Sequence, residues 1–214
     1  MGTETKTNTL VGGLNQSDAD HTKHQDPDVE LMLAFQAGDE QAFTTLYEKY
    51  RDRLVNYSRR FLIDRARGEE AAQDVFLKLY RARARYQPVS RFSTYLFRIA
   101  TNHCLNVLQR HDQKLVDRGT ELSERPGAVL RDGQSSPEDA YSQTELRDFV
   151  NAAIGRLAEN QRAAFLLCHY QGMSYREAAQ VIEVTEGAVK SLIHRARERL
   201  AKELEPLRGL QGGA

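Results

Sequence analysis

Apolar residues recur at three- and four-residue steps through most of this chain, which is the spacing of one face of a helix. The longest such run follows Asp39 and consists of Phe43, Leu46, Tyr47, Tyr50, Leu54 and Phe61. A second run follows Ser90 and consists of Phe92, Leu96, Ile99 and Leu105. No stretch of the sequence alternates apolar and polar residues as a half-buried strand does. The pattern therefore predicts an all-α fold.

The helical periodicity is interrupted between Gln113 and Ser142, where glycine, proline and serine accumulate. We therefore expect two small helical domains, at residues 28–112 and 138–207, joined by a flexible linker at 113–137. Residues 1–27 have almost no apolar periodicity and predict a disordered tail, and 208–214 predict a flexible C-terminal tail. Start and stop signals predict helices at about 28–37, 39–61, 68–86, 90–111 and 160–170, the first of them capped by Asp28.

Charge is balanced over the whole chain, with 30 lysines and arginines against 30 aspartates and glutamates, so the net charge says nothing about a partner. From Arg51 to Arg118, however, bases outnumber acids roughly two to one, as expected of a segment that faces a polyanion. The two cysteines, Cys104 and Cys168, lie far apart and predict reduced thiols and no metal site. The sequence shows neither a signal pattern nor an apolar run long enough to span a membrane, so we expect a cytoplasmic protein without membrane insertion.

The stretch from Ser174 to Leu200 has the pattern of a helix-turn-helix. Ser174 and Glu177 predict a capping box at the start of a short helix. The turn Glu183-Val184-Thr185 follows, and Thr185 can cap a second helix. The apolar residues of that second helix share one stripe, namely Val189, Ile193, Ala196 and Leu200.

The opposite face of this second helix is small near its start and cationic beyond it. A recognition helix enters the major groove with its N-terminal residues, so small side chains there permit close approach while the bases reach phosphates or base edges. Taken alone, the helix is equally well explained as a solvated charged face, but the capping box, the turn and the basic second half together favour DNA binding. Glu186 either stabilises the helix dipole or accepts from a cytosine amino group. The candidate DNA-binding residues here are Arg176, Thr185, Glu186, Gly187, Ala188, Lys190, Ser191, His194 and Arg195.

Two segments of the first domain carry further candidate surfaces. Ala71, Ala72, Val75 and Leu79 form a buried stripe, and the apolar Leu77 lies among charged residues on the other side, which indicates a protein-docking surface. Residues 88–110 combine aromatic, amide and guanidinium groups, which suit stacking on unpaired bases and holding their backbone. An ordinary polar surface is the alternative for both segments.

Four motifs follow one another along the chain. They are EAAQDVFLKLYR at 70–81, FSTYLFRIATN at 92–102, LAENQR at 157–162, and MSYREAA at 173–179 with VKS at 189–191 and HRAR at 194–197. In this order and spacing they resemble bacterial RNA polymerase sigma factors of the extracytoplasmic-function (ECF) group, which have only the domains called sigma-2 and sigma-4. The resemblance covers about residues 28–112 and 138–205.

The resemblance implies an alternative sigma factor, a protein without enzymatic activity or cofactor that directs core RNA polymerase to a subset of promoters and helps to melt them. It implies that sigma-4 reads the −35 duplex and touches the β flap, that sigma-2 captures single-stranded bases of the −10 element, and that an anti-sigma factor controls the protein. The residues expected at the −10 element are Arg91, Ser93, Tyr95, Arg98, Asn102 and Asn106. Those expected to grip the β′ clamp helices of the polymerase are Glu70, Gln73, Asp74, Phe76, Leu77, Lys78 and Arg81.

Two positions depart from the family pattern. Glu183 stands in the turn where members often have glycine, and Leu192 stands where they often have arginine after Lys-Ser. Leu192 lies at the border of the buried stripe, so we expect it to pack and one DNA contact to be lost. The departures leave the −35 sequence open, and nothing in the chain indicates the regulon, the stimulus, the identity of the anti-sigma factor or a role for the tail and linker.

Two rival functions fit parts of the sequence. A dimeric helix-turn-helix regulator accounts for the C-terminal motif but leaves the two surfaces of the first domain unexplained. A helical interaction protein or enzyme that uses only the first domain predicts no loss of function when residues 138–214 are deleted. No phosphate loop, activated nucleophile or metal-ligand set is visible, so the sequence favours a binding protein.

Overall fold

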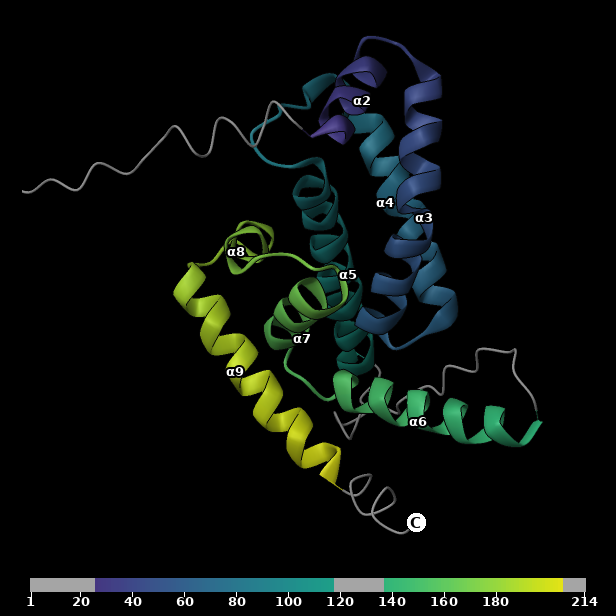
Figure 1. Cartoon of the computed structure of the whole chain (residues 1–214), viewed down its shortest axis with the longest axis vertical. Coiled ribbons are helices and arrows are strands. Elements are labelled where there is room, and N and C mark those ends of the chain that lie inside the picture. The colour runs from purple at the N-terminus through teal and green to yellow at the C-terminus, as the bar shows by residue number, and fades with distance from the viewer. Residues whose placement is uncertain (1–25, 118–136, 206–214) are drawn as a thin grey trace, which may run out of the picture.

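The computed structural model describes residues 26–117 and 137–205, and all of the regular structure in these two ranges is helical (Figure 1). Most of the expected N-terminal tail, most of the expected linker and all of the expected C-terminal tail lie outside the described residues. The first range contains α2 (Pro27–Gln36), α3 (Glu40–Leu62), α4 (Arg65–Ala82), the 3-10 turn η1 (Arg83–Arg85) and α5 (Phe92–Asp117). The second contains α6 (Pro137–Gly155), α7 (Glu159–Phe165), the π-helical turn η2 (Leu166–Tyr170), α8 (Tyr175–Ile182) and α9 (Glu186–Glu203).

The start of α2 corrects the expected cap. Asp26, and not Asp28, is the N-cap, because its Oδ1 accepts from the backbone N–H of Asp28 at 3.1 Å. The other oxygen of Asp26 accepts from the backbone N–H of Phe92 at 3.0 Å, so one carboxylate caps α2 and also holds the first residue of α5. Asp28 is instead buried and binds Lys49 Nζ at 2.6 Å and the hydroxyl of Tyr50 at 2.6 Å. It therefore ties α2 to α3.

The other boundaries of the first unit differ from the expected ones by a few residues. Helix α4 begins at Arg65 because Asp64 caps it, accepting from the N–H of Arg67 at 2.9 Å. It ends at Ala82, where η1 takes over. Helix α5 continues to Asp117, five residues into the segment expected to be linker.

The core of this unit is built from the predicted apolar stripes. Leu46, Leu54 and Phe61 of α3 are fully buried, and they face the equally buried residues Val75 and Leu79 of α4 and Phe92, Leu96 and Phe97 of α5. The hydroxyls of Tyr57 and Thr101 bond at 2.7 Å within this core, which satisfies the polar end of a buried aromatic ring. The periodicity of the sequence thus places most of the core correctly; the exception is Tyr47, which is 36% exposed.

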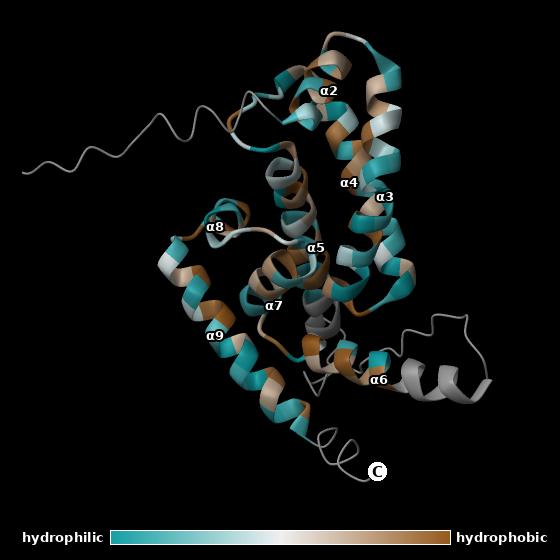
Figure 2. Ribbon diagram, viewed as in Figure 1, coloured by the Kyte–Doolittle hydropathy of each residue, from teal (hydrophilic) through white to brown (hydrophobic). Residues whose placement is uncertain are grey.

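The second unit packs directly against the first. Helix α8 lies against α5, and α6 and η2 lie against α3, so α5 has the first unit on one side and the helix-turn-helix on the other (Figure 1). Figure 2 shows hydrophobic residues on α5 and α7, which lie inside the assembly, and frequent hydrophilic residues along α9, which lies at its edge. The sequence indicated two separate units and gave no sign of this contact.

The turn of the helix-turn-helix contains a strained residue. Glu183 ends α8 with φ 59° and ψ 44°, a left-handed conformation in which a side chain costs about 1 kcal/mol and glycine costs nothing. This position is the one where the family pattern often has glycine.

Replacing Glu183 with glycine is therefore expected to raise the free energy of unfolding by about 0.5–1 kcal/mol in urea denaturation. Glu183→Ala is the matched control, because it removes the same charge but keeps a Cβ atom in the left-handed region. The explanation by backbone strain is wrong if the alanine variant gains as much stability as the glycine variant.

Candidate nucleic-acid and protein interfaces

The helix-turn-helix has the local chemistry that the sequence predicts. Ser174 Oγ accepts from the N–H of Glu177 at 3.2 Å, and Glu177 Oε2 accepts from the N–H of Ser174 at 2.8 Å, which completes the capping box. Thr185 Oγ1 accepts from the N–H of Ala188 at 3.2 Å and caps α9. These bonds fix the directions in which α8 leaves the preceding turn and α9 begins.

Helix α9 separates its two faces as expected. The predicted stripe of Val189, Ile193, Ala196 and Leu200 is buried, and Leu192 is half-buried and packs against this core, as its border position indicated. Of the candidate DNA-binding residues, Ala188 is half-buried, and the exposed ones are Arg176, Thr185, Glu186, Gly187, Lys190, Ser191, His194 and Arg195.

Two internal contacts modify the outer face of α9. The hydroxyl of Ser191 donates to the carbonyl oxygen of Gly187 at 3.1 Å, and His194 Nδ1 lies 3.3 Å from Glu198 Oε2. A Cβ atom added to Gly187 would meet nothing within 4 Å, so packing inside the protein does not require a glycine here. The open space leaves room for a DNA backbone to approach the start of the helix.

Helix α4 presents a mixed polar and apolar surface. Leu77 is 51% exposed, and the expected docking residues Glu70, Gln73, Lys78 and Arg81 are exposed around the same helix. Phe76 differs from the rest of the expected set. It is only 5% exposed and packs its ring 4.8 Å from that of Tyr47, so it belongs to the core and cannot offer its side chain to a partner.

A buried histidine connects α4 with α5. His103 Nδ1 lies 2.6 Å from Lys78 Nζ, and its Nε2 lies 3.5 Å from Asp74 Oδ2. Burial lowers the pKa of His103, and the ammonium group of Lys78 lowers it further, so the neutral ring accepts from Lys78 and presents its other nitrogen to Asp74. Sequence reasoning missed this role, because it depends on Lys78 and Asp74, which lie on a different helix.

The residues expected at the −10 element fall into two groups. Tyr95, Arg98, Asn102 and Asn106 follow one another along α5, and the two asparagines are exposed. The guanidinium of Arg98 lies 5.9 Å from the ring of Tyr95, and the ring of Tyr86 packs against that of Tyr95 with 5.0 Å between the centroids. Tyr86 was not anticipated; its hydroxyl is buried without a hydrogen-bond partner among the described residues, and burial raises its pKa to about 12.

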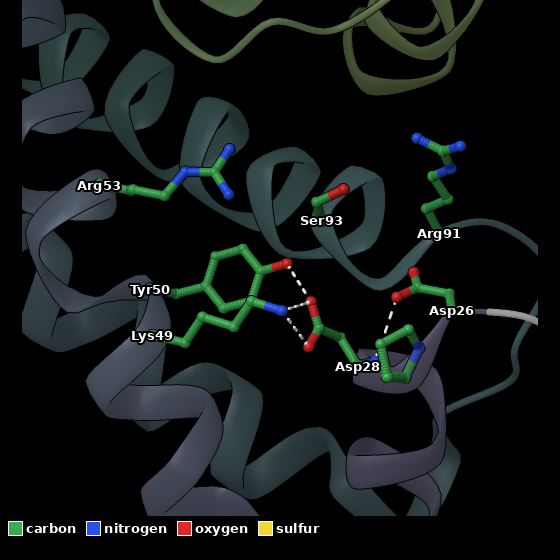
Figure 3. A pocket seen from close by; sticks show the side chains of 8 residues that line it. Asp26, Asp28, Lys49, Tyr50, Arg53, Arg91 and Ser93 are labelled. Atoms are coloured by element: carbon green, nitrogen blue, oxygen red, sulfur yellow. Dashed lines mark hydrogen bonds and ion pairs between the residues drawn. The ribbon is translucent and has the colours of Figure 1, made fainter.

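The second group lies at the start of α5. Arg91 and Ser93 line an open cavity of about 430 Å³ (Figure 3). The remaining wall contains both signs of charge and consists of Asp26, Pro27, Asp28, Lys49, Tyr50 and Arg53. Arg91 also pairs with Glu177 of α8 at 3.3 Å, so the structure connects a candidate −10 residue with the helix-turn-helix.

The described residues contain no cluster of three or more histidine, cysteine or acidic side chains that could hold a metal ion. Cys104 is buried and Cys168 half-buried, and burial raises the pKa of both thiols, which makes them poor nucleophiles. Among the described helices none is long and apolar enough to cross a membrane.

Comparison with known proteins assigns both units to families. Residues 46–114 match sigma-70 region 2, and residues 150–200 match sigma-70 region 4. The chain is 35% identical over 188 residues to the RNA polymerase sigma-H factor of Pseudomonas aeruginosa, covering 86% of this chain and 96% of that protein. It is 32% identical over 184 residues to the ECF RNA polymerase sigma-E factor of Escherichia coli K12, covering 84% and 95%.

Solved structures share the fold. CnrH, determined in complex with the cytosolic domain of CnrY, is similar with a TM-score of 0.63 at 25% identity, over 85% of this chain and 99% of that one. The sigma factor RpoE of Bartonella quintana, determined in complex with the anti-sigma factor NepR, is similar with a TM-score of 0.64 at 21% identity, over 76% and 96%. The matched regions define the class of helical transcription initiation factors, which are not enzymes. The chain belongs to the sigma-70 family, in its ECF group, as the four motifs indicated.

Proposed function

We propose that this protein is an alternative sigma factor that binds core RNA polymerase, recognises the −10 and −35 elements of a subset of promoters and helps to melt them. The observation that carries the proposal is that sigma-70 regions 2 and 4 occur together, in this order, in one chain. In this proposal residues 28–112 form the sigma-2 domain and residues 138–207 the sigma-4 domain. As a partner of the polymerase the protein would act in the cytoplasm and perform no covalent chemistry itself.

The sigma-4 unit would read the −35 duplex through α9. The exposed bases Lys190 and Arg195 and the open position of Gly187 support this role, because all three lie on the face opposite the buried stripe. Gly187 and Lys190 also lie near the capped end of the helix. The half-buried Leu192 cannot reach across this face as an arginine would. The same unit would also touch the β flap.

The sigma-2 unit would hold the single-stranded −10 element along α5. Tyr95 offers a ring face, Arg98 a cation beside it, and Asn102 and Asn106 exposed amides. Stacking on such a ring is worth about 1–3 kcal/mol per base. The adjacent ring of Tyr86 is buried and supports that of Tyr95 from inside the protein.

Helix α4 would dock on the β′ clamp helices through the surface centred on Leu77. Replacing Leu77 with aspartate puts a charge into the centre of this contact, so we expect at least about a tenfold loss of affinity for core polymerase. Binding of a −35 duplex by the free protein should not change. Binding of labelled protein to core polymerase measures the first effect, and Glu48→Ala, at an exposed position of α3, is the control. Unchanged polymerase affinity in Leu77→Asp would remove α4 from the interface.

Control by an anti-sigma factor is part of the same proposal. It is supported by the ECF membership of the chain and by the similarity to CnrH, which was determined in complex with a cytosolic partner domain.

Run-off transcription with purified core polymerase tests the function as a whole. We expect transcripts from a defined subset of genomic promoters when the full chain is present, and none from core polymerase alone or with a chain that lacks residues 138–214. A dimeric regulator predicts the opposite result, namely no binding to core polymerase and protection of an intact palindromic duplex in footprinting. Full activity of the truncated chain would favour a function of the first domain alone.

A further inference from the structure

The ring of His103 bridges two charged side chains of the neighbouring helix. His103 belongs to α5 and is buried where α5 packs on α4. Its two ring nitrogens contact Lys78 Nζ at 2.6 Å and Asp74 Oδ2 at 3.5 Å, and both of these residues belong to α4. An ammonium group can only donate, so Nδ1 accepts from Lys78 and the ring carries its proton on Nε2, facing the carboxylate. One buried ring thus holds a cation and an anion of the same helix.

This bridge replaces the pairing that the sequence of α4 favours. Asp74 and Lys78 are four residues apart, the spacing at which an acid and a base on a helix surface pair with each other. In the structure each of them contacts the ring of His103 instead. Two charges that pair directly cancel most of the field that a partner would feel, whereas two charges on different atoms of a ring stay separate. His103 therefore preserves two distinct charges on the surface of α4.

The two charges lie beside the exposed Leu77. Residues three apart are neighbours on a helix surface, so Leu77 adjoins Asp74, and Lys78 follows it directly. The side chain of Asp74 is 48% exposed and Lys78 is exposed, so both remain accessible to a partner although the ring holds them from beneath. Protein interfaces combine an apolar centre with a polar rim that orients the partner. Asp74 and Lys78 have the place of such a rim around Leu77.

The bridge requires a neutral ring. Burial lowers the pKa of His103, Lys78 and Arg110 lower it further, and Asp74 and Glu70 oppose them without reversing the shift. At neutral pH the ring is therefore uncharged and can accept from Lys78. A proton on Nδ1 would remove the acceptor and put a second cation against the ammonium group. The bridge is thus intact above the pKa of His103 and is lost as the pH falls through it.

We propose that His103 is a positioning residue for the binding of core polymerase. From inside the protein its ring keeps Lys78 and Asp74 separate and fixes both at the rim of the contact centred on Leu77. The inference rests on the proposed docking of α4 and adds a residue that does not itself touch the polymerase. It also gives α5 a second role, because the helix proposed to hold the −10 strand arranges the polymerase-binding charges of its neighbour.

Two substitutions separate the bridge from ordinary packing. His103→Leu fills the buried site and contacts neither charge through a hydrogen bond. His103→Gln can accept from Lys78 with its carbonyl oxygen and donate to Asp74 with its amide, and it does not titrate. At neutral pH we expect His103→Leu to bind core polymerase about three- to tenfold more weakly than the wild type, and His103→Gln to bind within about twofold of it. Labelled full-length protein measures the affinity, and circular dichroism checks the fold.

A double-mutant cycle distinguishes positioning from a merely structural role. In the background of Asp74→Asn with Lys78→Met the ring has no charges to hold, so adding His103→Leu should leave the affinity for core polymerase unchanged. A general disturbance of the helix packing would weaken binding in this background as well. A further loss of the same size as in the wild type would therefore overturn the proposal.

The pH profile gives an independent measurement. Between about pH 8 and pH 5 the affinity of the wild type for core polymerase should decrease by a component that His103→Gln lacks. His169→Gln is the control, because it removes an exposed histidine of η2, whose ring stacks on that of Phe165 at 5.1 Å. This control should keep the profile of the wild type.

The proposal is overturned if His103→Leu binds core polymerase as tightly as the wild type, or if the wild type and His103→Gln share one pH profile. Should His103→Leu fail to fold, the pH profile of His103→Gln decides the question. Comparison with Leu77→Asp separates this inference from the function on which it rests. If Leu77→Asp weakens binding and His103→Leu does not, only the positioning role is wrong, whereas unchanged affinity in both variants would also remove α4 from the polymerase contact.

Discussion

Arg162→Met should lower the free energy of unfolding by about 3 kcal/mol, the largest effect on stability that we expect from a single change. Methionine keeps much of the side-chain volume, so the loss of stability comes from the hydrogen bonds of the buried guanidinium. It donates to three carbonyl oxygens, those of Phe61, Gly155 and Leu157. Each of these groups loses a charge-assisted hydrogen bond inside the protein, where water does not replace it. Thermal or urea denaturation measures the change, and the melting temperature should fall by about 10 °C for a chain of this size.

Arg156→Met is the matched control for this prediction. Arg156 is also an arginine close to the end of α6, but it is exposed and pairs with Glu203 at 2.7 Å on the surface. Such pairs contribute about 0.2–1 kcal/mol, so the control should lose little stability. Similar losses in both variants would show that the carbonyl cluster around Arg162 does not have the assigned energetic role.

The double substitution Lys190→Ala and Arg195→Ala is expected to weaken binding to a −35 duplex by at least about 30-fold, without changing the affinity for core polymerase. Both side chains are exposed, and each lost contact should cost about 1–3 kcal/mol. If both residues bind phosphates, the slope of log affinity against log salt concentration should also fall by about 2. Fluorescence anisotropy over a salt series measures the two quantities together.

Lys202→Ala is the control, because it removes the same charge as Lys190→Ala from an exposed position near the other end of α9. A recognition helix contacts bases with its N-terminal part, so this change should weaken binding by less than about threefold. If Lys202→Ala weakens binding as much as the double variant, a nonspecific attraction between α9 and DNA explains the data better than specific recognition by Lys190 and Arg195.

Local chemistry explains which parts of the fold the sequence predicts. The capping box of Ser174 and the buried stripe through Val189 depend on residues at most a few turns apart, and both are present as expected. The cap of α2 was assigned to Asp28 because either aspartate suits that role. Only the packing of α3, which brings Lys49 and Tyr50 to Asp28, decides in favour of Asp26.

The candidate surfaces also depend on contacts between distant residues, which the sequence does not predict. The exposure of Leu77 follows from the period of α4, but Phe76 was placed on the surface although it is buried by Tyr47, a residue of another helix. His103 and Tyr86 were missed because their roles depend on neighbours distant in the sequence. The contact between Arg162 and the carbonyl oxygen of Phe61 is the extreme case, since only tertiary structure brings these two residues together.

The double role of Asp26 has a consequence for the minimal length of a functional fragment. A chain trimmed to begin at Pro27 would lose the carboxylate of Asp26, which would uncap α2 and release the first residue of α5, 66 positions away. Proteolytic trimming beyond this residue would therefore loosen α5, the helix proposed to hold the −10 strand, without cleaving α5 itself. Shortening the N-terminus past residue 26 is therefore expected to disturb the helix proposed to bind the −10 element.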